Sequence, residues 1–203
     1  MKKLLLIGIS LTLGFSTNYQ TKAINYFSKG DYKNAIKYYG IDCENNKNID
    51  SCLISANLSQ TALNNEKKAL TYYKKACELN NKVGCAMSGK IEYKLNHKKE
   101  AFKFDEKACK LNSPKGCNAM GDFYFKGELV KKDLKTSFNY YKKSCKLNSP
   151  AGCNSLGLAY EKGLGTEIDL IKAREIYAKS CRWGYQKGCN NFNRISKNKN
   201  AYR

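Results

Sequence analysis

The sequence predicts an all-α fold, a solenoid of about five helix-turn-helix repeats clipped together by disulfides. The first observation is internal repetition, because KACKLNSPKGC at 107–117 returns thirty-six residues later, nearly unchanged, as KSCKLNSPAGC at 143–153. The second is that ten cysteines form five pairs whose first members are 34, 32, 36 and 36 residues apart, a period typical of helical repeats. The third is a hydrophobic content of 42% in 203 residues, which is sufficient for a packed interior.

The helix that ends at the first cysteine of each pair, here called helix B, has a repeating packing face. Eight positions before that cysteine the residue is always small, and five positions before it the residue is large and apolar or aromatic. Positions i, i+3 and i+8 share one face of a helix, and a small residue there lets a neighbouring helix approach closely. The small residues are Ala35, Ala69, Ala101, Ser137 and Ala173, and the large ones are Tyr38, Tyr72, Phe104, Tyr140 and Ile176.

The helix that follows the second cysteine, here called helix A, has a small residue four positions past that cysteine. Large residues such as Met120 and Tyr124 flank the small one on the same stripe. Gly127 and Gly163 suit the left-handed conformation that ends a helix, so they mark where helix A stops. The small residues are Ala56, Gly89, Gly121 and Gly157.

The corner from helix B to the next helix A can be predicted residue by residue. Asn112 can adopt the left-handed conformation just past helix B, Ser113 can cap the next helix, and Pro114 fits its first turn. This corner is tight, so Cys109 and Cys117 are expected to face each other across it.

Ten cysteines in an exported chain are first interpreted as a disulfide framework. In an antiparallel helix pair the last turn of one helix lies beside the first turn of the next, which can bring two Cα atoms within the roughly 4.4–6.8 Å that a disulfide requires. Pairing each second cysteine with the next first one would leave Cys43 and Cys189 over, whereas sequential pairing leaves none. The predicted disulfides are Cys43–Cys52, Cys77–Cys85, Cys109–Cys117, Cys145–Cys153 and Cys181–Cys189.

Other chemistry for the cysteines is poorly supported. Zinc sites favour more closely spaced cysteines, often with histidines, and this chain has one histidine, His97, in the predicted link LNHKKEA, where a solvated side chain is expected. Redox catalysis would call for a Cys-x-x-Cys motif, which does not occur. We therefore predict no metal and no cofactor.

The first residues predict export. Met1-Lys2-Lys3, the apolar run 4–15 and small residues around Ser16 are typical of a signal peptide, and the run is too short for a membrane-spanning helix. The expected organisation is a signal peptide at 1–16, with cleavage after Ala23 as the alternative, a repeat domain at 17–196 and a basic tail at 197–203. The sequence thus predicts a secreted or periplasmic protein without a transmembrane segment in the mature chain.

The net charge of the chain indicates which classes of partner to expect. Removing Lys2 and Lys3 from a net charge of +20 leaves +18, which favours anionic partners such as polysaccharide, lipopolysaccharide or an acidic protein surface. Nucleic acid is a poor expectation for an exported protein. The alternative is that the lysines simply solvate helix faces.

The units KACKLNSPKGCNAMGDFYFKG and KSCKLNSPAGCNSLGLAYEKG resemble the Sel-like branch of the tetratricopeptide repeats. With the paired cysteines and the signal peptide, the chain is similar to the Helicobacter cysteine-rich protein family over nearly all of residues 20–195; the first unit, CENNKNIDSC, is the most divergent. The resemblance implies an exported, right-handed α/α superhelix. It also implies the family's description as penicillin-binding proteins with weak β-lactamase activity and as secreted factors that engage host cells.

The residues themselves offer no catalytic set for that activity. Serine β-lactamases use Ser-x-x-Lys, Ser-Asp-Asn and Lys-Thr-Gly around one pocket. Here Ser-x-x-Lys occurs only at 196–199 in the polar tail, Ser-Asp-Asn is absent, and Lys135-Thr136-Ser137 is a partial match at the start of a helix B. The catalytic residues of any β-lactamase activity are therefore unknown from the sequence.

Two further hypotheses concern binding. In the first, stacked A helices line a concave groove for a protein, peptide or glycan, with Asn118, Asp122 and Asn154 as candidate contacts, although these side chains could equally be ordinary solvated positions. In the second, the tail and the Lys-Lys pairs at 74–75, 131–132 and 142–143 form a stripe for an anionic surface.

Overall fold

The computed structural model describes residues 18–197, and within that range the chain forms helices and connecting loops, with no strand. The predicted signal peptide at 1–16 and the basic tail beyond Lys197 lie outside the described residues. The alternative cleavage point after Ala23 falls inside a helical segment, 18–28. No helix within residues 18–197 combines the length and the apolar character that crossing a bilayer requires.

The chain divides into two compact units, residues 1–91 and 92–203, and the boundary falls inside α5 (Lys82–Lys94). Unit 1 also contains the helical segment 18–28 and the helices α2 (Tyr32–Asn46), α3 (Ile49–Thr61) and α4 (Glu66–Glu78). Unit 2 contains α6 (Lys98–Lys110), α7 (Pro114–Lys126), α8 (Leu134–Lys146), α9 (Pro150–Lys162), α10 (Leu170–Arg182) and α11 (Gln186–Ser196).

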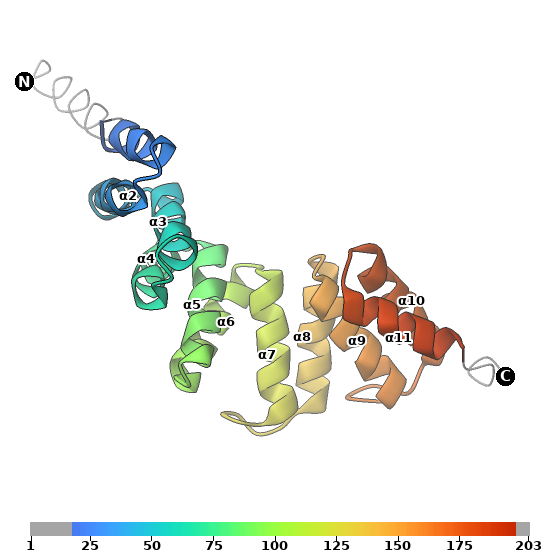
Figure 1. The fold of residues 1–203 in the computed structure, drawn as a ribbon. Coiled ribbons are helices and arrows are strands. Elements are labelled where there is room, and N and C mark those ends of the chain that lie inside the picture. The colour runs from blue at the N-terminus through green and yellow to red at the C-terminus, as the bar shows by residue number, and fades with distance from the viewer. Residues whose placement is uncertain (1–17, 198–203) are drawn as a thin grey trace, which may run out of the picture. The chain divides into compact units, whose positions relative to one another are not determined.

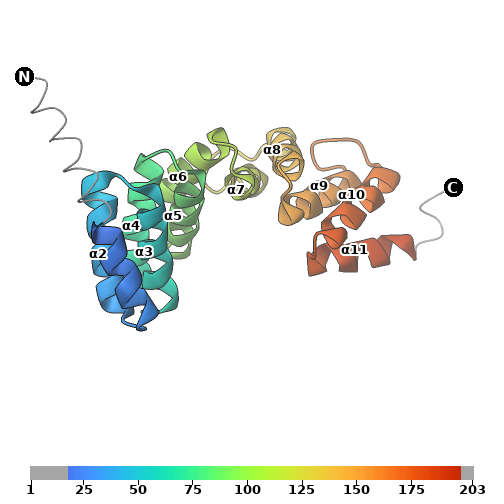
Figure 2. The same ribbon diagram turned by 90° about the horizontal axis from the view of Figure 1, so that it is seen from above.

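Within each unit, consecutive helices pack side by side as antiparallel pairs (Figure 1 and Figure 2). In unit 1, α3 packs against both α2 and α4, and in unit 2 each helix from α7 to α10 packs against the helix before it and the helix after it. Even-numbered helices are the predicted B helices and odd-numbered ones the predicted A helices. The predicted class, an all-α solenoid of helix-turn-helix repeats, is therefore confirmed.

The small residues of helix B form the closest packing face, as predicted. The four alanines eight positions before the first cysteines are fully buried, and Ser137 is 2% exposed. The prediction for the large residues was less accurate, because the position five before the cysteine is mostly only partly buried. The buried column lies one residue later, where i+4 rather than i+3 faces inward. It consists of Tyr39, Tyr73, Asp105, Tyr141 and Tyr177.

The corners have the predicted cap geometry. Asn112 has a left-handed backbone with φ 58°, and the Ser113 hydroxyl accepts a hydrogen bond from the Gly116 N–H, with Pro114 in the first turn of α7. Gly127 and Gly163 end α7 and α9 in the left-handed region, with φ 72° and 66°. These local signals act through the backbone itself, which is why they could be predicted from a single sequence.

A disulfide spans each corner, between the same cysteines that the sequence pairs. The Cα–Cα distances lie between 4.4 and 4.8 Å. Such an approach requires small residues beside the cysteines: a Cβ on Gly116 would lie 2.5 Å from the Ala108 Cβ, and one on Gly152 would lie 2.1 Å from the Ser144 Oγ. The Gly-Cys dipeptide on one side and Ala-Cys or Ser-Cys on the other thus create the space for the covalent clip.

The first corner, which has a different sequence, closes in another way. Asp42 and Ser51 stand in the positions of the small residue and the glycine, and the Ser51 hydroxyl donates to a carboxylate oxygen of Asp42 over 2.5 Å. Asn46 and Gln20 also donate to this fully buried carboxylate. In this corner, a hydrogen bond between a hydroxyl and a carboxylate therefore replaces the close contact between two small residues. The two cysteines are nine residues apart instead of eight.

Candidate functional site

The A helices of unit 2 contact one another from repeat to repeat, since α7 packs against α9 and α9 against α11. Side chains at matching positions on these helices therefore lie on one continuous face. Asn118 and Asp122 of α7, Asn154 of α9 and Asn191 of α11 all lie partly buried on it. We call these four residues the polar row.

Asn118 and Asp122 stand one turn apart on α7 and form the best-connected part of the polar row. The Asn118 Nδ2 donates to one oxygen of Asp122 over 3.4 Å, and the Tyr141 hydroxyl donates to the other over 2.7 Å. The Asn118 Oδ1 is buried and accepts no hydrogen bond within the described chain. Burial raises the pKa of Asp122, while the bond from Tyr141 and the charge of Lys126 act in the opposite direction.

Asp105 lies beneath this group, in the buried column of helix B where the other repeats have tyrosine. It is only 4% exposed, and burial together with the negative charge of Asp122 raises its pKa to about 8. An acid with that pKa is largely neutral at physiological pH, and as a neutral acid it can donate a hydrogen bond. The sequence signal for this residue was its departure from the tyrosine column, and the column itself was placed one residue too early.

Tyr141 and Tyr177 of the buried column reach carboxylates of helix A, Asp122 and Glu161, because helix A has a glycine where each tyrosine crosses it. A Cβ on Gly121 would lie 2.4 Å from the Tyr141 ring, and one on Gly157 would lie 2.8 Å from the Tyr177 ring. Each ring therefore packs directly against the backbone of helix A. This confirms the predicted role of the small residue four positions past the second cysteine.

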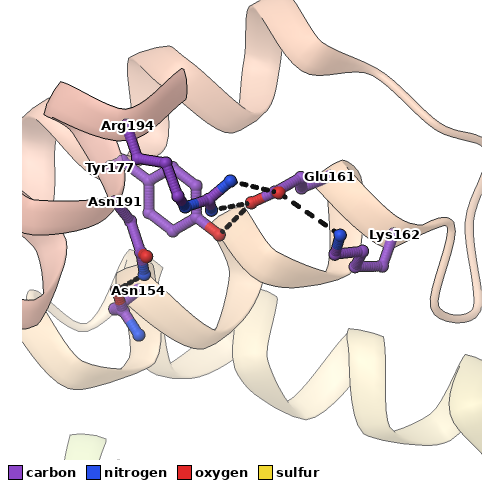
Figure 3. Close-up of polar contacts among 6 residues, drawn as sticks. All are labelled: Asn154, Glu161, Lys162, Tyr177, Asn191 and Arg194. Atoms are coloured by element: carbon purple, nitrogen blue, oxygen red, sulfur yellow. Dashed lines mark hydrogen bonds and ion pairs between the residues drawn. The ribbon is translucent and has the colours of Figure 1, made fainter. Parts of the chain in front are cut away.

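Beyond Asn154 the row ends in a charged cluster, shown in Figure 3. Arg194 of α11 donates two hydrogen bonds, of 2.8 and 2.7 Å, to the two oxygens of Glu161, and Tyr177 adds a third of 2.9 Å. These donors, with the Arg194 charge, keep the pKa of Glu161 below its usual value in spite of burial. Beside them, the Asn191 Nδ2 donates to the Asn154 Oδ1 over 2.9 Å.

The structure brings two of the three predicted contacts together and places the third one repeat away. Asn118 and Asp122 bond directly, whereas Asn154 bonds to Asn191 instead. Sequence reasoning missed the residues on other helices that contact these groups, which are Asp105, Tyr141 and Asn191. It also missed the neighbouring cluster of Glu161, Tyr177 and Arg194.

The residues of the partial β-lactamase motif and the single histidine make contacts within the repeats. The Ser137 hydroxyl donates to the Gly121 carbonyl over 2.8 Å inside the packing of α8 on α7, and the Thr136 N–H and hydroxyl both bond to the capping Asp133. His97 is largely exposed, and its Nδ1 lies 2.7 Å from Glu92. The described residues contain no group of three or more His, Cys, Asp or Glu side chains placed to hold a metal.

Comparison with known proteins agrees with this architecture. The Sel1 repeat profile matches residues 60–81, 114–149 and 150–185, and the tetratricopeptide repeat profile matches residues 16–40. Cysteine rich protein B of Helicobacter pylori is 40% identical; the match covers 61% of this chain and 92% of that protein, with a TM-score of 0.51. The chain therefore belongs to the Sel1-repeat family of the Helicobacter cysteine-rich type. No curated protein matches it.

Two further solved structures share the fold. One is c5321, a protective antigen present in uropathogenic Escherichia coli strains, at 24% identity and a TM-score of 0.74. That match covers 81% of this chain but 37% of c5321, so the chain spans little more than a third of that protein. The other is a Sel1 repeat protein from Oxalobacter formigenes, at 18% identity and a TM-score of 0.69, with 89% of this chain and 85% of that one covered.

Proposed function

We propose that this cysteine-rich Sel1-repeat protein is a binding scaffold, and that the polar row of unit 2 holds a peptide segment of a partner protein. The observation that carries the proposal is the polar row itself, in which side-chain amides of α7, α9 and α11 and the Asp122 carboxylate lie on helices that contact one another.

The neighbouring groups supply what an extended peptide needs. Side-chain amides on three adjacent helices can donate and accept at once, and the Asp122 carboxylate offers an acceptor beside them. Leu158, one turn along α9 from Asn154, is 37% exposed and offers an apolar contact. Repeat scaffolds bind along such surfaces because each repeat contributes one similar contact.

Peptide selection tests this proposal. Peptides displayed on phage would be selected on the mature oxidised protein and then measured against a variant with Asn118→Ala, Asp122→Ala and Asn154→Ala. A double variant of exposed amides away from the row, Asn25→Ala with Asn139→Ala, is the matched control. We expect the triple variant to lose at least about tenfold in affinity, equivalent to ~1.4 kcal/mol, while the control binds normally. Equal binding by the triple variant would refute the role of the row.

We also propose that the protein acts outside the cytoplasm, in the periplasm or the medium. Two observations support this proposal. A disulfide spans every corner, and such bonds persist in oxidising compartments; the first residues of the chain also have the pattern of a signal peptide. Cleavage after Ser16 is favoured over cleavage after Ala23, because Ala23 is fully buried in the packing of unit 1. N-terminal sequencing of the exported protein should begin at Thr17, and non-reducing peptide mapping should recover only the sequential cysteine pairs.

Binding or hydrolysis of β-lactams rests on family resemblance alone. Within the described chain, the residues of the partial motif 135–137 make structural contacts. The Thr136 N–H bonds to the helix-capping Asp133, and the Ser137 hydroxyl donates to the Gly121 carbonyl in the core. Incubating the oxidised protein with a chromogenic cephalosporin provides the test: hydrolysis no faster than in buffer, together with no saturable binding, would remove this hypothesis.

A further inference from the structure

The corners between helix B and helix A in unit 2 differ in charge from those in unit 1. The equivalent eleven-residue segments 107–117, 143–153 and 179–189 contain three, two and three basic residues and no acidic one; Lys142 directly precedes the second segment and Glu106 directly precedes the first. The two corners of unit 1 mix both signs. Their acidic residues are Asp42, Glu44, Asp50 and Glu78, and their basic residues are Lys47, Lys75 and Lys82. With Lys142 included, the nine basic residues at the corners of unit 2 are Lys107, Lys110, Lys115, Lys142, Lys143, Lys146, Lys179, Arg182 and Lys187.

These nine cations lie along one edge of unit 2, which we call the corner edge. The corners are joined by helices that all span the unit, so every corner falls on the same side (Figure 1). The long loops that join α7 to α8 and α9 to α10 lie at the opposite edge, where Glu128, Asp133, Glu167 and Asp169 accompany the lysines. The expected lysine stripe is therefore corrected: Lys131–Lys132 and Lys142–Lys143 stand at opposite ends of α8, roughly 16 Å apart along the helix axis.

Internal partners leave most of this charge uncompensated. Within the described chain, Lys110 is the only one of the nine that forms an ion pair, with Glu106 over 3.0 Å. Lys143 instead donates to the Cys109 carbonyl over 3.0 Å, which orients it along the edge. Like charges gathered on one edge repel one another, so an anion bound there relieves a cost that the folded unit otherwise carries.

We propose that the corner edge binds a linear anionic polysaccharide bearing sulfate or carboxylate groups. Cationic clusters that recur with each repeat fit a polymer whose anionic groups also recur along its length. The last corner adds aromatic surface, since Trp183 and Tyr185 stand where the two preceding corners have Leu and Ser, and Trp183 is 38% exposed. Lys179 lies 4.8 Å from the Trp183 ring centroid, so this corner presents an aromatic face beside cations, suited to a charged sugar ring.

Other anionic partners fit the edge less well. A stable protein interface needs an apolar centre, but Leu111 and Leu147 of the earlier corners are partly buried and Trp183 is the exposed large apolar residue of these segments. A bilayer surface would require apolar side chains along the whole edge to insert among the lipids. This inference concerns a different face from the polar row and does not depend on the proposed peptide binding.

Charge reversal on matched edges tests the proposal. The corner variant carries Lys115→Glu, Lys146→Glu and Lys187→Glu, and the control variant carries Lys131→Glu, Lys132→Glu and Lys135→Glu. All six lysines are exposed, and each variant lowers the net charge by six, two per substitution. Binding of the mature oxidised protein to heparin, a sulfated polysaccharide, would be measured by titration calorimetry at two salt concentrations. Circular dichroism would verify that both variants are folded.

We expect wild type to bind heparin more weakly as salt rises, the corner variant to lose at least about tenfold in affinity, and the control to lose less than about threefold. Equal losses in both variants would show that net charge alone is responsible, and would overturn the proposal. It would also be overturned if wild type failed to bind heparin, or if it bound vesicles containing phosphatidylglycerol more tightly than heparin.

Discussion

The buried carboxyl of Asp105 gives the sharpest prediction, because it ties a stability change to pH. Its folded pKa of about 8 lies above the unfolded value near 3.8, so the folded protein holds a proton that the unfolded chain releases. Stability should therefore fall as pH rises from about 4 to about 8 and then level off. Between pH 5 and pH 7.5 the loss amounts to roughly 3 kcal/mol, at about 1.4 kcal/mol per pH unit.

The substitution Asp105→Asn keeps the shape of the side chain and removes its ionisation. Urea unfolding followed by circular dichroism, with the disulfides intact, would give the free energy of unfolding of both proteins at each pH. We expect the advantage of the variant over wild type to grow by roughly 3 kcal/mol from pH 5 to pH 7.5. Glu100→Gln, an exposed change on the same helix, should show no such growth. A difference that stays constant within about 1 kcal/mol would mean that Asp105 is ionised in the fold, and the reasoning would be refuted.

Three further predictions concern packing. Gly121→Ala should lower the free energy of unfolding by about 1–3 kcal/mol, measured in urea, because its Cβ would overlap the tyrosine ring that lies on this helix. Arg194→Ala should cost about 1–3 kcal/mol and speed hydrogen exchange in α11, because the buried Glu161 loses its two hydrogen bonds from Arg194 and keeps only Lys162, 3.6 Å away, as a charged partner; unchanged exchange would contradict this. Replacing Cys145 and Cys153 together by alanine should cost about 2.5 kcal/mol, seen as a lower urea midpoint than in the fully oxidised protein.

Local features of the fold could be predicted from the sequence because they depend on neighbouring residues. Asn112 and Ser113 set the corner through their own backbone and side chain, and the fixed cysteine spacing follows from that corner. The phase of helix B could not be settled in the same way. Tyr140 and Tyr141 are both aromatic, and the inward choice between them depends on where Gly121 of the preceding helix lies, which is a tertiary fact.

The candidate site was harder to predict, since its members are bonded across repeats. Glu161 and Arg194 are thirty-three residues apart, and each, taken alone, has the pattern of a solvated charge at the end of a helix. Asp105 was missed for a related reason. A polar residue in an otherwise aromatic column is expected to face water, and its burial becomes evident only when α7 covers it.

Stability and the proposed peptide binding depend on the same packing arrangement. Glycine in helix A lets a tyrosine of the following helix B pack directly against the backbone. This packing places the tyrosine hydroxyl against a carboxylate of helix A, as with Tyr141 and Asp122. The contact that joins adjacent helices therefore also fixes an acceptor of the polar row. Substituting Asp122 will disturb both, whereas Asn154, whose only described partner is Asn191, reports on the row alone. A loss of peptide binding in Asn154→Ala with unchanged stability would thus separate recognition from packing.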